Sequence, residues 1–337
     1  MTLISIRGGG IAACCCARLL TRAGLAVASE PAAHPKVPAV MLGEVTQRLL
    51  GDVFDRGDLF TGLHCIRRRA VLWGNSEPTV LPHSAVVASE QEILNRLQAE
   101  MLPGGAEQGD LPLWKILAAR VPREDGDVLR AEQNFGSRTA SVTRVRLKAE
   151  EASDTCWIEA ATEGWLFLLP CGPENAWLLA AGGPAETLLE RSRFVATQIG
   201  ETGAWTGSFP SHPRITEPLA RPGWLACGSA ALAFDPLCGE GAGNAAREAI
   251  LAAALIRAAA SGMNPTELTA HYTARLLGGF VRHLEVCRQF YETGGSGAWW
   301  RQQVTELDRG LQWTAERLNR HDGFRYRLNG FTLEAAI

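Results

Sequence analysis

A group of glycines near the start of the chain has the spacing of a phosphate-binding turn. It stands in the stretch ISIRGGGIAACCCARLL at residues 4–20, where Gly8, Gly10 and Ala13 fit the pattern G-x-G-x-x-A. Gly8 allows the chain to leave a strand in a tight turn, and Gly10 has no side chain to keep a pyrophosphate away. Ala13 is small enough for the following helix to lie close to a sheet. The pattern therefore predicts a binding turn for an anion at a helix N-terminus.

Such a turn needs a strand before it, a helix after it and a second strand that ends in an acid. Residues 3–6 favour a short strand, residues 12–22 a helix, and residues 25–30 a second strand that ends at Glu30, 20 residues after Gly10. A carboxylate at that place accepts hydrogen bonds from ribose hydroxyls. The alternative is a purely structural glycine turn with an incidental Glu30.

The nine cysteines raise the question of a metal or redox centre. Cys14, Cys15 and Cys16 are consecutive, the others are scattered singly, and no C-x-x-C pair occurs. Three consecutive residues on a helix point about 100° apart and do not face one ion. We therefore expect no metal site, and reduced, buried thiols that pack as small apolar side chains.

A second glycine-dense stretch follows more than 200 residues later. Residues 223–247 read GWLACGSAALAFDPLCGEGAGNAAR, which predicts a strand that ends near Gly228 and a loop that feeds an alanine-rich helix up to about Ala260. A glycine-rich loop before a helix again favours an anion. Two such turns predict one long ligand that is held at both ends.

Together the two stretches resemble the FAD-dependent monooxygenases of the para-hydroxybenzoate hydroxylase type. The sequence FDPL at residues 234–237 is most similar to that of the flavin-dependent halogenase-like branch. The resemblance implies an FAD pyrophosphate at the first turn, ribose at Glu30, and isoalloxazine beside the second loop. The cofactor-binding residues that it implies are Gly8, Gly9, Gly10, Ile11, Ala12, Ala13, Ser29, Glu30, Arg48, Gly228, Ser229, Asp235, Pro236, Gly239, Gly241, Ala242 and Asn244.

The chain departs from the family pattern in two places. Ser229 stands where the family usually has an acid, and a hydroxyl accepts a hydrogen bond less strongly than a carboxylate. Residues 164–170 align loosely with the W-x-W-x-I-P signature of the halogenases, but Phe167 and Leu169 replace two of its residues. The chain also has only three lysines, and none lies in a halogenase context.

The remaining segments predict the rest of the fold. We expect an α/β protein with a Rossmann-like FAD-binding domain of the glutathione reductase type, an interleaved β-sheet substrate domain and a helical C-terminal tail. The boundaries are 1–60, 84–125 and 215–262 for the first domain, 61–83 and 126–214 for the second, and 263–337 for the tail. Aromatic side chains of the second domain are candidates for the substrate pocket: Trp157, Trp165, Phe167 and Trp177.

Composition excludes some classes of function. A net charge of −3 gives no electrostatic reason to expect nucleic acid, and no apolar run reaches the roughly 18 residues of a membrane span. No secretory signal is recognisable, so we expect a cytoplasmic protein.

The expected function is that of an FAD-dependent oxidoreductase, a monooxygenase or hydroxylase that acts on an aromatic or apolar substrate, small or peptidyl, through a flavin C4a-hydroperoxide. NAD(P)H binds transiently, or a separate flavin reductase supplies the electrons. The alternatives are a halogenase-like enzyme, a flavin-dependent maturase or reductase, and a non-catalytic flavin-fold protein. No catalytic residue is assigned, although His64 and His83 are considered as pocket groups.

Overall fold

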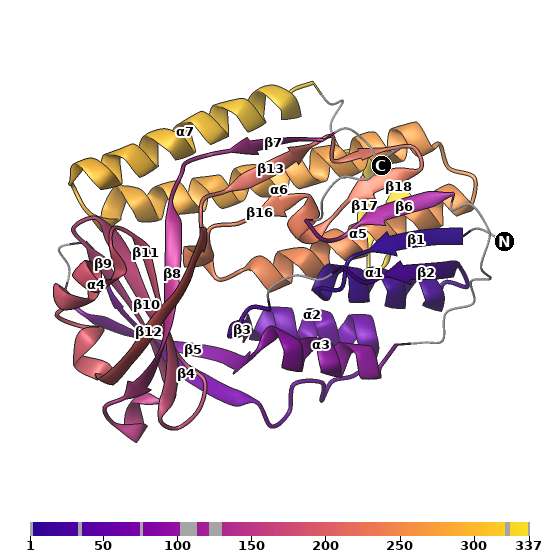
Figure 1. The fold of residues 1–337 in the computed structure, drawn as a ribbon. Helices are drawn as coiled ribbons and strands as arrows, with labels where there is room; N and C mark the ends of the chain where they lie inside the picture. Colours follow the sequence, from indigo (N-terminus) through magenta and orange to yellow (C-terminus); the bar gives the residue numbers. More distant parts are fainter. Residues whose placement is uncertain are drawn as a thin grey trace.

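The computed structural model describes residues 3–32, 36–74, 77–101, 113–120, 130–320 and 324–335. Figure 1 shows a large twisted sheet at one side, a smaller sheet with its helices at the other, and two long helices, α6 and α7, that run along the molecule and connect both parts. Among these residues no helix combines the length and the apolar character that a membrane crossing requires.

The smaller sheet contains the predicted β-α-β unit at the N-terminus. Its strand order is β14-β15-β6-β1-β2, in which β14 is antiparallel to β15 and the other neighbours are parallel. Its strands are β1 (Leu3–Arg7), β2 (Ala26–Glu30), β6 (Trp114–Leu117), β14 (Ala220–Arg221) and β15 (Trp224–Ala226). Helix α1 (Ile11–Arg22) connects β1 to β2, so the predicted strand, helix and strand are confirmed.

The larger sheet has eight strands in the order β12-β8-β11-β10-β9-β4-β5-β3, with β4 and β9 as the parallel pair. Its strands are β3 (Val40–Gly43), β4 (His64–Leu72), β5 (Thr79–Ala88), β8 (Thr139–Leu147), β9 (Thr155–Ala161), β10 (Gly164–Pro170), β11 (Asn175–Gly182) and β12 (Ile199–Pro210). Strand β3 and the end of β5 extend this sheet into segments that the sequence assigns to the first domain. The domain boundaries remain a prediction.

A small third sheet and a hairpin complete the β structure. The sheet has the order β16-β13-β7, formed by β7 (Ala131–Asn134), β13 (Arg214–Glu217) and β16 (Leu232–Ala233). The hairpin is formed by β17 (Tyr326–Asn329) and β18 (Thr332–Ala335). The predicted domain boundary between residues 125 and 126 lies outside the described residues, as do all residues of 121–129.

The other helices are α2 (Glu44–Phe54), α3 (Glu90–Ala99), α4 (Ala185–Glu190), α5 (Gly241–Ala260), α6 (Pro265–Gly294) and α7 (Ala298–Leu318). Helix α6 begins at Pro265, because the side chain of Asn264 accepts a hydrogen bond from the Thr266 amide and Pro265 takes the first position. Trp300 of α7 is buried and donates to the carbonyl oxygen of Ala161 at 3.0 Å. This bond connects the C-terminal tail to β9 of the large sheet.

The consecutive cysteines of α1 lie in the core. Cys14, Cys15 and Cys16 are all buried, and all nine cysteines are free thiols. Helix α1 packs against α5, and the Sγ of Cys16 lies 3.7 Å from the carbonyl oxygen of Ala249. Close helix packing requires small side chains here, which explains the run of alanine and cysteine.

Candidate functional site

The first glycine turn has one closed side and one open side. Gly8 has a φ of +144°, and a Cβ atom there would lie 3.0 Å from backbone atoms of Ala118 and Ala119. Only glycine fits this position without a shift. A Cβ at Gly9 or Gly10, in contrast, would have no neighbour closer than 3.9 Å. The turn is therefore packed against the end of β6 and open where a ligand would approach.

The open side faces the N-terminus of α1. Gly10 is the N-cap residue, in extended conformation, and no side chain caps the helix. The amides of Ile11, Ala12 and Ala13 have no intrahelical acceptors, since these are the first residues of the helix. Uncapped amides and the positive end of the helix dipole are suited to a phosphate.

Glu30 ends β2 beside this turn and is exposed. Its backbone carbonyl accepts the amide of Gly8 at 2.9 Å, and its carboxylate accepts the hydroxyl of Ser5 at 3.0 Å. Ser29, the preceding residue, is also exposed. The carboxylate is thus oriented by the neighbouring strand and still available to a ribose.

The second stretch contacts the first directly. Gly228, in the short helix η3 (Gly228–Ala230), has a φ of +57°, and a Cβ there would lie 2.8 Å from the Cβ of Ala12. Ser229 is exposed, and its carbonyl oxygen accepts a hydrogen bond from buried Arg214 at 2.6 Å. Residues more than 200 positions apart therefore meet at the N-terminus of α1.

Helix α5 presents its N-terminus at the same end of the molecule as α1. At the far ends of the two helices, the guanidinium carbon of Arg22 lies 5.0 Å from the ring centroid of Phe331, and Arg257 donates to the carbonyl oxygen of Phe331 at 3.0 Å. Together with the contact between Cys16 and Ala249, this means that α1 and α5 lie side by side and run in the same direction (Figure 1).

The loop before α5 is open on its outer side. Helix η4 (Pro236–Cys238) is followed by Gly239, with a φ of +64°, and no side chain caps α5 at Glu240. A Cβ at Gly241 would have no neighbour within 4 Å. Asn244 accepts a hydrogen bond from Arg247 at 2.8 Å. The candidate cofactor-binding residues of this segment that are at least partly exposed are Pro236, Gly239, Gly241, Ala242 and Asn244.

Asp235 is the member of the candidate set that faces inward. It is buried, caps η4 by accepting the Leu237 amide at 2.9 Å, and forms an ion pair with buried Arg138. Arg138 also donates to Gln303 at 2.6 Å and to the carbonyl oxygen of Ser211 at 2.9 Å. The carboxylate of Asp235 is therefore occupied, and its role here is to fix the loop.

Arg48 lies on α2. It is exposed, lies 3.8 Å from Glu44 one turn earlier, and lines a cavity of about 990 Å³ together with Arg247 and Phe60. Another basic residue, Lys36, lies near the start of α1. Burial raises the pKa of Cys14 on α1 to about 11, and the positive charge of Lys36 opposes that rise. The sequence gives no signal for Lys36 beyond its position six residues after Glu30.

Two further residues were not found from the sequence. Thr46, near the start of α2, packs so closely on α5 that a Cβ at Gly243 would lie 2.7 Å from its Oγ1. Glu248 of α5 is buried and accepts the amide of Gly228 at 2.7 Å, and burial raises the pKa of its carboxyl to about 8. Glu248 therefore supports the second glycine turn from behind.

The aromatic candidates of the large sheet divide between its two faces. Trp165 and Phe167 alternate on one face of β10, and Trp177 pairs with Leu169 on that face. Trp157 pairs with Leu168, so it lies on the opposite face, in a core cluster with Leu166 and α4. Phe167 and Trp177 are partly exposed. Trp165 is buried and donates to the hydroxyl of Tyr291 at 2.9 Å.

The two histidines considered as pocket groups are bound to neighbours. His64 Nε2 lies 2.7 Å from the carbonyl oxygen of Ser153. His83 Nε2 lies 3.2 Å from Arg69, and burial followed by the charge of Arg69 lowers the pKa of His83.

Comparison with known proteins identifies solved structures with a similar fold. No protein-family model matches the chain, and no curated protein does so either. Among solved structures, the peptidyl tryptophan dihydroxylase QhpG matches with a TM-score of 0.64 and 18% identity, over 99% of this chain and 86% of that one. The flavin-dependent halogenase CmlS matches with a TM-score of 0.70 and 16% identity, over 98% and 74%.

A third similar structure contains the cofactor. An HpxO variant from Klebsiella pneumoniae in complex with FAD matches with a TM-score of 0.60 and 16% identity, over 96% of this chain and 100% of that one. These similarities confirm the predicted fold class: a Rossmann-like domain with an interleaved sheet and a helical tail. The chain therefore shares its fold with these three structures, of which one is a flavin-dependent halogenase and one contains FAD.

Proposed function

We propose that this protein is an FAD-dependent oxidoreductase of the monooxygenase type. The observation that carries the proposal is the contact between Gly228 and Ala12, which joins the two glycine turns at the end where α1 and α5 both begin. Both turns are suited to FAD. Gly8 and Gly228 pack against neighbouring residues of the protein, whereas Gly10 and Gly241 have free space on their outer side. The similar structures support the same cofactor, since one of them holds FAD.

Each part of the site has a distinct task in this proposal. The amides of α1 hold the diphosphate, and Glu30 accepts the hydroxyls of the adenosine ribose. Bound FAD supplies the redox chemistry and the reaction with oxygen. The amides at the start of α5 stabilise negative charge on the reduced ring, because they lie at the positive end of the helix dipole and no side chain caps them.

The substrate that we propose is aromatic and either small or peptidyl. QhpG is described as acting on peptidyl tryptophan, and the alignment with QhpG covers almost the whole of this chain. Phe167 and Trp177 give the large sheet a partly exposed aromatic face on which such a substrate would lie. NAD(P)H or a separate flavin reductase would deliver the electrons. Because all nine cysteines are free, we also propose the reducing cytoplasm as the location.

The absorbance of the purified protein tests the cofactor. Flavin bands, before or after reconstitution with FAD, are expected for wild type. Gly10→Val should lose them, because its side chain would occupy the open side of the turn, while the fold has room for it. Gly57→Val is the matched control: it also has open space, but it lies two residues after Asp55, which pairs with Arg22 at the opposite end of α1. Flavin retained by Gly10→Val as in the control would reject the proposed site.

A further inference from the structure

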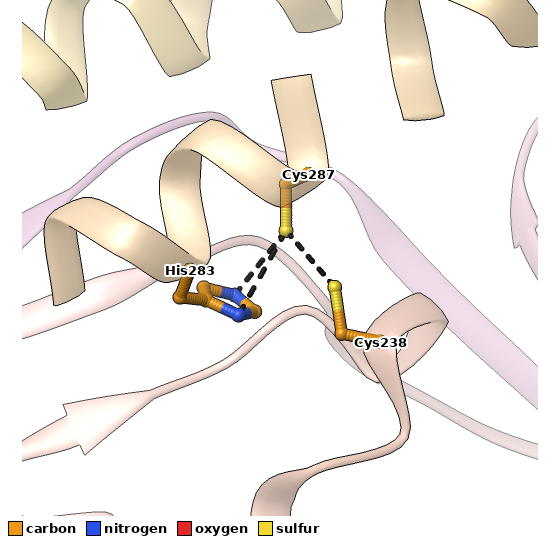
Figure 2. Close-up of side chains that lie close together, drawn as sticks. All are labelled: Cys238, His283 and Cys287. Atoms are coloured by element: carbon orange, nitrogen blue, oxygen red, sulfur yellow. Dashed lines mark hydrogen bonds between the residues drawn. The ribbon is translucent and has the colours of Figure 1, made fainter. Parts of the chain in front are cut away.

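Two cysteines and a histidine form a cluster next to the loop before α5. Cys238 ends η4, and His283 and Cys287 lie one turn apart on the same face of α6. The two sulfur atoms are 3.5 Å apart, and Cys287 Sγ lies 3.3 Å from His283 Nε2 (Figure 2). Cys287 is fully buried and His283 is buried, whereas Cys238 is partly exposed. The pair therefore joins a partly exposed cysteine to a fully buried one.

The surroundings make Cys238 the more acidic of the two thiols. A hydrogen bond from Cys287 lowers the pKa of Cys238 to about 6, and His283 adds to this against the effect of burial. Burial raises the pKa of Cys287 instead. The thiolate is the nucleophile in thiol chemistry, so the partly exposed cysteine is also the more reactive one.

A bound metal ion is the competing explanation, because sulfur and imidazole are ligands for zinc. The backbone amide of Asp235 donates to His283 Nε2 at 2.9 Å, which leaves the ring proton on Nδ1. A metal at Nε2 would leave that buried amide without its acceptor. A metal at Nδ1 would place a proton on Nε2, facing the Asp235 amide. Both arrangements cost a buried hydrogen bond, so the geometry favours a thiol pair.

The chain contains a second thiol pair with which to compare the first. Cys16 and Cys227 have their sulfur atoms 4.0 Å apart, and both residues are fully buried. A hydrogen bond with Cys16, followed by burial, raises the pKa of Cys227 well above its usual range. The spacing of the two pairs is similar, but of these two only the pair near α5 has a partly exposed cysteine and a neighbouring histidine.

We propose that Cys238, His283 and Cys287 form a thiol redox site that reduces a hydroperoxide and closes into a Cys238–Cys287 disulfide. The proposal does not depend on bound flavin, since the reaction needs only the two thiols and the peroxide. His283 acts as a positioning residue, because its Nδ1 and Nε2 lie 3.9 Å and 3.3 Å from Cys287 Sγ.

The reaction balances with hydrogen peroxide as the oxidant. The Cys238 thiolate attacks one oxygen, the O–O bond breaks, and the second oxygen leaves as hydroxide, which becomes water on taking up a proton. Cys287 sulfur then attacks the sulfenic acid on Cys238, the S–O bond breaks, and the thiol proton leaves with the hydroxyl as a second water. The two sulfurs together lose two electrons, and one peroxide gains them. The sulfurs must approach from 3.5 Å to about 2.05 Å, which pulls the loop before α5 toward α6.

The test uses the reduced, purified full chain and one equivalent of hydrogen peroxide. Remaining thiols are blocked with N-ethylmaleimide under denaturing conditions, and peptides are mapped by mass spectrometry without reduction. We expect a peptide pair linked through Cys238 and Cys287, while Cys16 and Cys227 are recovered alkylated. Peroxide that leaves both pairs alkylated, or that links them at equal rates, would overturn the proposal.

Variants separate the roles of the three residues. Cys287→Ser should stop at a sulfenic acid on Cys238, trapped by dimedone, and Cys238→Ser should give neither product. His283→Gln retains an acceptor for the Asp235 amide but has no imidazole to stabilise the Cys238 thiolate, so disulfide formation should slow severalfold at a pH below about 6, the pKa of Cys238. An unchanged rate would remove His283 from the site. One equivalent of zinc that protects Cys238 and Cys287 from alkylation in wild type, but not in His283→Gln, would show a metal site instead.

Discussion

The buried carboxyl of Glu248 accepts the backbone amide of Gly228 at 2.7 Å. Its other oxygen, Oε1, has no hydrogen-bond partner among the described residues. Burial raises the pKa of the carboxyl from 4.5 to about 8, so the folded protein keeps the acid neutral at pH 7. Stability should therefore depend on pH through this residue.

The direction of this pH dependence follows from the number of protons that the folded and unfolded states bind. Between about pH 4.5 and 8 the folded state binds one more proton at Glu248 than the unfolded chain. The free energy of unfolding therefore falls as the pH rises through that range, by up to about 1.4 kcal/mol per pH unit. Glu248→Gln cannot titrate and should be more stable relative to wild type at pH 8 than at pH 5. Urea denaturation at both pH values measures this, with exposed Glu174→Gln as the control. A difference between Glu248→Gln and wild type that is the same at both pH values would contradict the pKa.

Removing one partner of the buried ion pair between Arg138 and Asp235 should lower the free energy of unfolding. Asp235→Ala leaves the Arg138 guanidinium in the core without its counter-charge, and we expect a loss of about 3–5 kcal/mol in the free energy of unfolding. The double variant Arg138→Met with Asp235→Leu should lose less, because no charge remains buried.

The exposed pair of Arg146 and Glu201 offers a comparison on the large sheet. Glu201→Ala should change the unfolding midpoint little, since ion pairs in water contribute little. If Asp235→Ala were as mild as Glu201→Ala, the pair would not hold the loop.

The turns could be predicted from the sequence because they depend on local sterics. The positive φ of Gly8 and the close packing of Gly228 need glycine whatever surrounds them, and the small residues of α1 show where a helix lies close to its neighbours. Glu30 was found because it ends a strand next to β1, at a fixed distance along the chain.

The buried polar contacts could not be predicted, because they join distant segments. Arg138 opens an alternating stretch that reads as half-exposed, and nothing in it indicates Asp235 as a partner. His283 and Cys287 have helical spacing, but Cys238 comes from a loop before another helix. Glu248 reads as an interruption of an apolar run until the fold places it behind Gly228.

Glu30 should contribute to the affinity for FAD without being essential to the fold. Glu30→Ala removes a charged acceptor worth about 1.5–3 kcal/mol per hydrogen bond, so the dissociation constant of FAD should rise by about ten- to a hundredfold. Titration of the flavin-free protein, followed by flavin fluorescence, measures this. Ser5→Ala, which removes only the hydroxyl that orients Glu30, should have a smaller effect. Equal affinities for Glu30→Ala and wild type would place the ribose elsewhere.

Cys238 should react with alkylating reagents at an unusually low pH. The groups that face it are His283 and Cys287 on α6 and Asp235 on its own segment, and the hydrogen bond from Cys287 is the largest cause of its lowered pKa, about 6. The rate of carbamidomethylation at Cys238, followed by mass spectrometry from pH 5 to 10, should have its midpoint near pH 6.

Cys171 is also partly exposed, but burial raises its pKa, so its midpoint should come at a higher pH in the same sample. Cys287→Ser weakens the donated bond and should move the Cys238 midpoint upward. A Cys238 profile that coincides with that of Cys171 would mean that the neighbouring thiol and imidazole do not stabilise the thiolate.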